Sequence, residues 1–108
     1  MASIQLTAVV TPKPGKTQRF LDLFSACVEY VQANEPQVYR YEMHEGIPEL
    51  NGGKRQFIVL EGYKNQEALD AHMKAPPVVL MLDAMEKEDL TETQLIMTKP
   101  STGIKPQL

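Results

Sequence analysis

The chain contains stretches in which apolar residues occupy every second position, which is the period of a β-strand. The first stretch covers residues 3–11 and places Ile4, Leu6, Ala8 and Val10 on one face. Proline and glycine follow it at once, as expected where a strand ends. The two faces of residues 37–45 and 55–63 predict two further strands, and we expect a last strand over residues 90–99.

Apolar residues spaced three and four positions apart predict helices between these strands. Asn65 is the predicted cap of the second helix, whose apolar stripe includes His72 and therefore turns this imidazole inward. Two prolines, Pro76 and Pro77, end that helix and allow another to begin, because proline fits the first helical turn. The predicted helices span residues 16–34, 66–74 and 78–87.

The order strand, helix, strand, strand, helix, strand is that of a ferredoxin-like split βαβ fold. The predicted class is α+β with an antiparallel sheet, and it carries one additional helix before the last strand. Helices cover only one face of the sheet in this fold, so the other face needs either a polar surface or a partner. We expect one domain over residues 1–99 and a C-terminal tail or dimer arm over residues 100–108.

Each predicted strand has a more apolar and a less apolar face. We expect the helices to cover the more apolar set, which comprises Ile4, Leu6, Ala8, Val10, Tyr39, Tyr41, Met43, Ile58 and Leu60. The other set is too apolar to face water alone, and it comprises Gln5, Thr7, Val9, Val38, Arg40, Glu42, His44, Phe57, Val59, Glu61 and Tyr63. We therefore expect an isologous homodimer that joins two such faces, with an aromatic-lined cavity between sheet and helices.

Composition excludes several classes of protein. At 108 residues and 12.1 kDa, the chain has the size of one domain. Its net charge of -3, with no block of basic residues, lacks the phosphate-neutralising surface of a nucleic-acid-binding protein. No apolar run approaches the length of a membrane span, and Cys27 has no second cysteine to pair with. We expect a soluble cytoplasmic protein that binds neither nucleic acid nor membranes.

Several short patterns together resemble the antibiotic biosynthesis monooxygenase domain. They are Gly15-Lys16 before the first helix, Glu35-Pro36 with Tyr41 five residues on, and above all Leu-Glu-Gly-Tyr-Lys-Asn-Gln-Glu-Ala-Leu-Asp-Ala-His, which ends at His72. The resemblance covers about residues 3–99. It implies a dimeric α+β barrel whose better-known members oxidise quinols, anthrones and related phenols with molecular oxygen, without metal or flavin. We accordingly expect an aromatic polyketide, anthrone or quinol-like substrate and no cofactor.

Oxidation without a cofactor requires that the substrate be ionised, so the site must remove a proton and stabilise the anion. His72 is the predicted base, because imidazole titrates near neutral pH. Glu61 is predicted to orient His72, although an ion pair with Arg40 would also satisfy a carboxylate in a strand. Tyr63 is predicted to steer the substrate oxygen, or else only to fill the cavity with its ring.

Five residues of the less apolar face are predicted to contact the substrate. Arg40 and His44 share one strand face and carry groups that bind acidic or phenolic ligands, although a solvated strand face explains them equally well. The predicted substrate-binding set is Arg40, His44, Phe57, Val59 and Thr7.

Two alternatives to a monooxygenase remain open from the sequence. The same cavity and base would serve the cyclisation or decarboxylation of a polyketide precursor, which needs no oxygen. A small-molecule-binding dimer without catalysis is the second. Two histidines with Glu42 and Glu61 would also match a set of iron ligands, but these residues lack the paired spacing of metal ligands, so we expect no metal.

Overall fold

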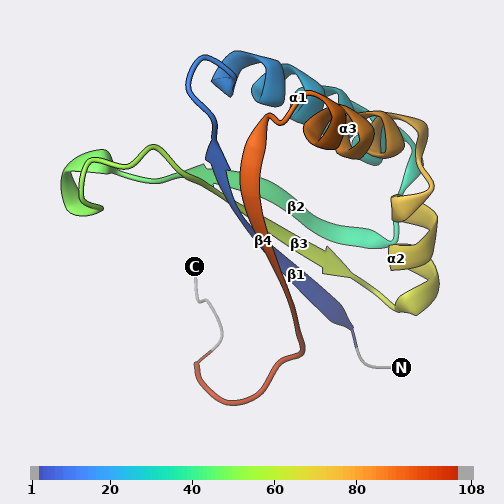
Figure 1. Ribbon diagram of the computed structural model, residues 1–108. Helices are drawn as coiled ribbons and strands as arrows, with labels where there is room; N and C mark the ends of the chain where they lie inside the picture. Colours follow the sequence, from blue (N-terminus) through green and yellow to red (C-terminus); the bar gives the residue numbers. More distant parts are fainter. Residues whose placement is uncertain (1–2, 105–108) are drawn as a thin grey trace.

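Four strands form one antiparallel sheet, and all three α-helices lie against the same face of it (Figure 1). The computed structural model describes residues 3–104 of the chain. The elements in chain order are β1 (Ile4–Pro12), α1 (Thr17–Asn34), β2 (Val38–Glu45), the short 3₁₀ helix η1 (Pro48–Leu50), β3 (Phe57–Tyr63), α2 (Gln66–Met73), α3 (Pro76–Lys87) and β4 (Thr91–Thr98).

The strands lie in the order β2-β3-β1-β4, so the first and third strands are central and the second and fourth form the edges. This arrangement confirms the predicted ferredoxin-like α+β fold. The predicted elements are all present within two residues at each end, and α3 begins at Pro76 itself, two residues before the predicted start. Only η1, inside the predicted loop 46–54, was not expected.

The core fills the space between the helices and the two central strands. Leu6, Ala8 and Val10 of β1 are each at most 5% exposed, as the alternation predicted. Phe20 and Phe24 of α1 lie above them with ring centroids 6.3 Å apart. Burial of such aromatic and aliphatic groups is the main favourable contribution to folding.

The prediction that Ile58 and Leu60 of β3 lie under the helices is wrong, because the opposite side of the strand faces the helices. Val59 pairs with Ala8 and Phe57 pairs with Val10, and directly opposite residues in an antiparallel pair share a face. Phe57, Val59 and Tyr63 are therefore buried under the helices. Ile58 and Leu60 lie on the uncovered face instead. Glu61 also belongs to the helical side of the sheet.

A register irregularity in β2 explains a second difference from the prediction. The pairing of β2 with β3 shifts between Val38 and Arg40, so Val38 joins the core side while Tyr39 lies on the uncovered face. The ring of Tyr39 lies against Gly62, where a Cβ atom would stand 2.5 Å from the ring. Beyond this bulge Tyr41 packs against the core as predicted.

The chain beyond β4 has no helix or strand in the described part, and Ile104 is 90% exposed. The predicted tail or dimer arm, residues 100–108, is thus described only to Ile104. Residues 105–108 lie outside the described residues, as do residues 1–2 of the predicted domain. Among the helices of residues 3–104, none combines the length and the apolar character needed to cross a bilayer.

Asn65 caps α2 as predicted. Its side-chain oxygen accepts a hydrogen bond from the backbone N–H of Ala68 at 2.9 Å, which satisfies one of the free donors of the first turn. The cap fixes where α2 begins and hence the rotation of its faces. His72 comes two turns later, on the side that packs against the sheet.

We predict that Asn65→Ala lowers the free energy of unfolding by about 1 kcal/mol, because the N–H of Ala68 loses its acceptor. Asn65→Asp keeps an acceptor at the same place and should retain most of the stability. Urea unfolding monitored by circular dichroism measures both variants. Equal midpoints for Asn65→Ala and the wild type would show that the cap contributes nothing.

Candidate functional site

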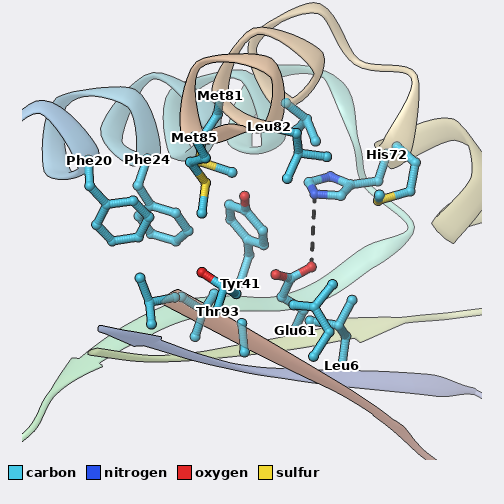
Figure 2. A pocket seen from close by; sticks show the side chains of 16 residues that line it. Leu6, Phe20, Phe24, Tyr41, Glu61, His72, Met81, Leu82, Met85 and Thr93 are labelled. Carbon is cyan, nitrogen blue, oxygen red and sulfur yellow. Dashed lines mark ion pairs between the residues drawn. The ribbon is translucent and has the colours of Figure 1, made fainter. Parts of the chain in front are cut away.

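A cavity of about 250 Å³ lies between the helices and the sheet (Figure 2). Its wall is almost wholly apolar, and its polar side chains are Tyr41, Glu61, His72 and Thr93. The other lining residues are Leu6, Ala8, Val10, Phe20, Phe24, Val59, Met73, Val78, Met81, Leu82, Met85 and Leu95. An apolar cavity with a few polar groups on one wall is typical of a site for a small organic molecule.

His72 lies at the wall of this cavity, near the end of α2. Its side chain is 3% exposed, so the predicted inward orientation is confirmed. One ring nitrogen, Nδ1, lies 3.0 Å from Oε1 of Glu35, and the other, Nε2, lies 3.9 Å from Oε1 of Glu61. Figure 2 shows the ring above the Glu61 carboxylate, which points up from the sheet. The imidazole is thus placed between two carboxylates.

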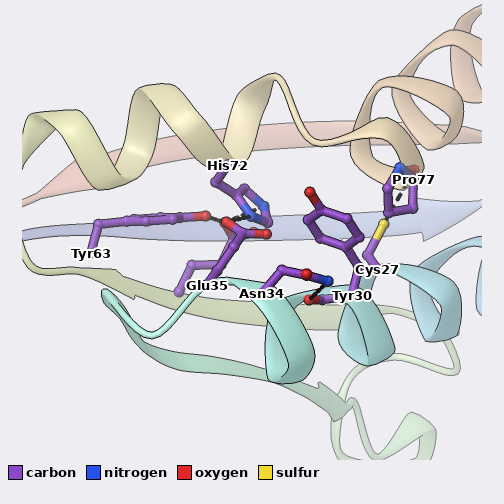
Figure 3. Close-up of polar contacts among 8 residues, drawn as sticks. Cys27, Tyr30, Asn34, Glu35, Tyr63, His72 and Pro77 are labelled. Atoms are coloured by element: carbon purple, nitrogen blue, oxygen red, sulfur yellow. Dashed lines mark hydrogen bonds and ion pairs between the residues drawn. The ribbon is translucent and has the colours of Figure 1, made fainter.

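Glu35 was not singled out for chemistry by the sequence, although it begins the Glu35-Pro36 pattern of the resemblance. It caps the C-terminus of α1, and its backbone N–H donates to the carbonyl of Val31 at 2.9 Å. Its carbonyl accepts from the N–H of Val38 at 3.1 Å, at the start of β2. The backbone is therefore held on both sides, and the side chain, 10% exposed, reaches His72 (Figure 3).

Glu61 projects from β3 into the cavity, and its side chain is 11% exposed. Burial raises the pKa of its carboxyl group, while the hydrogen bond from Tyr63 and the charge of His72 oppose that rise. The alternative prediction, that Glu61 forms an ion pair with Arg40, is wrong, because Nε of Arg40 lies 2.5 Å from Oε1 of Glu42 on the other face of the sheet. Glu35, not Glu61, makes the hydrogen bond that orients His72.

Tyr63 is fully buried and its hydroxyl donates to Oε1 of Glu61. Burial, with the nearby Glu61 carboxylate, raises the pKa of the phenol above its usual value, so the hydroxyl stays a donor. Tyr63 does not line the cavity. The hydroxyl that was predicted to steer the substrate oxygen is thus hydrogen-bonded to Glu61.

Tyr41 lines the cavity, and the sequence indicated only that it lies under the helices. Its ring stacks on Phe24 at 5.1 Å between centroids and meets the ring of His72 edge-on at 5.0 Å. One signal in the sequence pointed to Tyr41, namely its position five residues after Glu35-Pro36 in the pattern that carries the family resemblance. Tyr41 and His72 form adjoining parts of the cavity wall.

The predicted substrate-binding residues divide between the two faces of the sheet. Val59 lines the cavity, and Phe57 lies beneath Phe20 with centroids 6.0 Å apart. Thr7, Arg40 and His44 project from the uncovered face, so they do not reach the cavity.

The four residues weighed as an iron site are not brought together. Glu42 and His44 pair with each other at 3.2 Å on the uncovered face, whereas Glu61 and His72 lie on the helical side. Within residues 3–104, no cluster of three or more histidine, cysteine, aspartate or glutamate side chains has a geometry that would hold a metal ion.

The sequence model of the antibiotic biosynthesis monooxygenase family matches residues 3–82. The chain belongs to this family. The matched range covers Glu35, Tyr41, Glu61 and His72, the polar groups of the site except Thr93. It confirms the resemblance identified from the sequence. No curated protein sequence matches the chain.

Solved structures of the same fold are numerous among proteins of low identity. A Caulobacter crescentus protein proposed to be an antibiotic biosynthesis monooxygenase is 22% identical, with a TM-score of 0.78 over 94% of this chain and 92% of that one. Rv0793 from Mycobacterium tuberculosis is 18% identical, with a TM-score of 0.78 over 96% and 100%. SnoaB, a cofactor-independent oxygenase from Streptomyces nogalater, is 9% identical, with a TM-score of 0.75 over 98% and 100%. At these identities the likeness establishes the fold alone.

We predict that Glu61→Gln becomes more stable relative to the wild type as the pH rises. The folded state holds the Glu61 proton more tightly than the unfolded state, whose carboxyl titrates near its ordinary value of 4.5. The protonated Glu61 side chain therefore contributes its full stabilisation below about pH 4.5, and this stabilisation is lost as the pH rises through the raised pKa of Glu61. Glutamine does not ionise and escapes this loss. Thermal unfolding at about pH 4 and about pH 8 measures the difference.

Glu42→Gln is the matched control and should change with the opposite sign. Its hydrogen bonds from Arg40 and His44 lower the pKa of Glu42, so the wild-type carboxylate stabilises the fold above its ordinary pKa and not below. The same trend with pH in both variants would contradict the burial of Glu61.

Proposed function

We propose that the chain is a cofactor-independent monooxygenase that oxidises a quinol- or anthrone-like aromatic compound in the cavity. The observation that carries this proposal is the buried imidazole of His72, which lies between two carboxylates at the wall of an otherwise apolar chamber. Membership of the monooxygenase family supports it. So does the similarity of fold to SnoaB, itself a cofactor-independent oxygenase.

The chemistry begins with proton removal. Nε2 of His72 takes a proton from the substrate, which becomes an enolate or phenolate, and the imidazolium that forms stabilises the anion at short range. The anion then gives an electron to molecular oxygen, and the two radicals join as a peroxide. When the O–O bond breaks, one oxygen stays on carbon as a carbonyl and the other leaves as water with the two hydrogens that the carbon lost.

The apolar wall has two functions in this proposal. It excludes water, which strengthens the interaction between the substrate anion and His72. It also provides flat contacts for an aromatic ring through Tyr41 and Phe24. The volume of about 250 Å³ lies below the usual range for drug-sized ligands, so a substrate of one or two rings fits best within a single chain.

We further propose that two copies of the chain form the functional unit. β4 is an edge strand, and three successive apolar residues on it are exposed: Leu95 by 56%, Ile96 by 44% and Met97 by 55%. An exposed apolar edge strand is a site for pairing or packing with another chain. Leu95 is at the cavity wall while Ile96 faces the uncovered side, so a second copy would cover that side and adjoin the mouth of the cavity.

We predict that His72→Ala lowers turnover at least roughly tenfold, because the imidazole is the group that takes the substrate proton in the proposed reaction. His44→Ala, which removes the other histidine from the opposite face, is the matched control and should keep the wild-type rate. An oxygen electrode with a series of quinols and anthrones measures both. Product formation that continues at full rate under nitrogen would contradict the monooxygenase and favour a cyclase or decarboxylase.

For the homodimer, we predict a sedimenting mass of twice 12.1 kDa for the wild type and a monomer for Ile96→Lys. A charge at this position would be buried in the interface without a partner. Gln18→Lys places the same charge on an exposed turn of α1 and should leave the dimer intact. A wild type that sediments at 12.1 kDa would contradict the proposed dimer.

A further inference from the structure

The carboxylate of Glu35 is bound through one oxygen only. Oε1 lies 3.0 Å from His72 Nδ1, whereas Oε2 is the buried side-chain oxygen that has no hydrogen-bond partner within residues 3–104. A buried carboxylate oxygen without a partner costs stability. Positions that lower stability in this way are characteristic of functional sites rather than of purely structural ones. The single bond to His72 is therefore the one interaction that explains a glutamate here.

The ring of His72 has little freedom around this bond. The rings of Tyr41 and Tyr63 both pack against it, with centroids 5.0 Å and 5.3 Å from the imidazole. Figure 3 shows the Glu35 carboxylate meeting the ring at the end of α1. Nδ1 faces Glu35, and only Nε2 faces Glu61 and the cavity. Packing thus restricts the orientation of the ring, and the hydrogen bond to Glu35 decides which nitrogen carries the proton.

We propose that Glu35 is a positioning residue that holds the neutral imidazole of His72 with its proton on Nδ1, so that Nε2 presents a lone pair to the cavity. A carboxylate accepts hydrogen bonds and donates none, and imidazole is the weaker acid of the two, so the proton between them stays on Nδ1. Glu35 also offsets the positive charge that the ring gains when Nε2 takes a proton. Its role for catalysis rests on the proposed function, but the position of the proton does not.

The outer side of Glu35 gives the experiment a matched control. A hollow of about 270 Å³ on the surface is lined by both Glu35 and Glu67, and none of its lining residues is shared with the cavity. Glu67 lies in the first turn of α2, the helix that carries His72, and is exposed. Glu67→Gln therefore makes the same chemical change in the same hollow, on the helix that carries His72, without contacting the imidazole.

The test is long-range proton–nitrogen NMR of ¹⁵N-labelled protein at about pH 8, where an ordinary imidazole is neutral. The chain has two histidines, so a spectrum of His44→Gln assigns the signals of His72. We expect the wild type and Glu67→Gln to show Nδ1 protonated and Nε2 unprotonated. Glu35→Gln should show a mixture of tautomers or the reverse one, because an amide both donates and accepts.

Kinetics separate positioning from a merely structural role. We expect Glu35→Gln to lower kcat by at least roughly tenfold with KM nearly unchanged, because the substrate still fits while the base is wrongly protonated. Glu35→Asp keeps the charge but withdraws the oxygen by one methylene, and it should lose the single tautomer as well. It serves as the second variant if Glu35→Gln fails to fold.

Three results would overturn the proposal: a proton on Nε2 in the wild type, a single Nδ1 tautomer retained in both Glu35 variants, or an equal change in Glu67→Gln. The NMR measurement contains no substrate, so it can succeed when no quinol is oxidised. In that case the proposed function fails while the positioning by Glu35 stands.

Discussion

The site depends on the cost of burying charge in an apolar layer. Glu35, His72 and Glu61 come from the end of α1, from α2 and from β3, and all three side chains are nearly inaccessible to solvent. A carboxylate without a partner in such a place is strongly unfavourable, and the hydrogen bonds of Glu35 with His72 and of Glu61 with Tyr63 offset part of that cost. In the proposed reaction, the same low polarity strengthens the interaction of His72 with the substrate anion, so the arrangement that is costly for folding would also favour proton transfer.

The two faces of the sheet carry different groups of residues. The helical face holds the core, the cavity and every polar group of the candidate site. The uncovered face holds the surface cluster of Arg40, Glu42 and His44, whose side chains pair with one another rather than with the site. Along β4, apolar residues remain exposed on both faces, which is why we propose that a second copy of the chain packs against this edge.

The alternation of the strands and the spacing of the helices were enough to predict the fold, the buried His72 and the Asn65 cap. They did not fix the side of β3 that meets the helices, since Ile58 and Leu60 are as apolar as Phe57 and Val59. That choice is made by the pairing of Val59 with Ala8, a contact between residues far apart in the sequence. The bulge in β2, which turns Tyr39 outward, is likewise set by pairing. Glu35 was missed as a site residue because nothing local indicates that a helix end will lie against His72.

The proposed site is tested most directly by a crystal structure of the protein soaked with a quinol under nitrogen, so that the compound binds without being oxidised. We expect a ring in the cavity against Tyr41, with a hydroxyl within hydrogen-bond reach of His72 Nε2, about 2.6–3.2 Å. A quinol seated on the uncovered face beside Arg40 and His44, with the cavity empty, would contradict it.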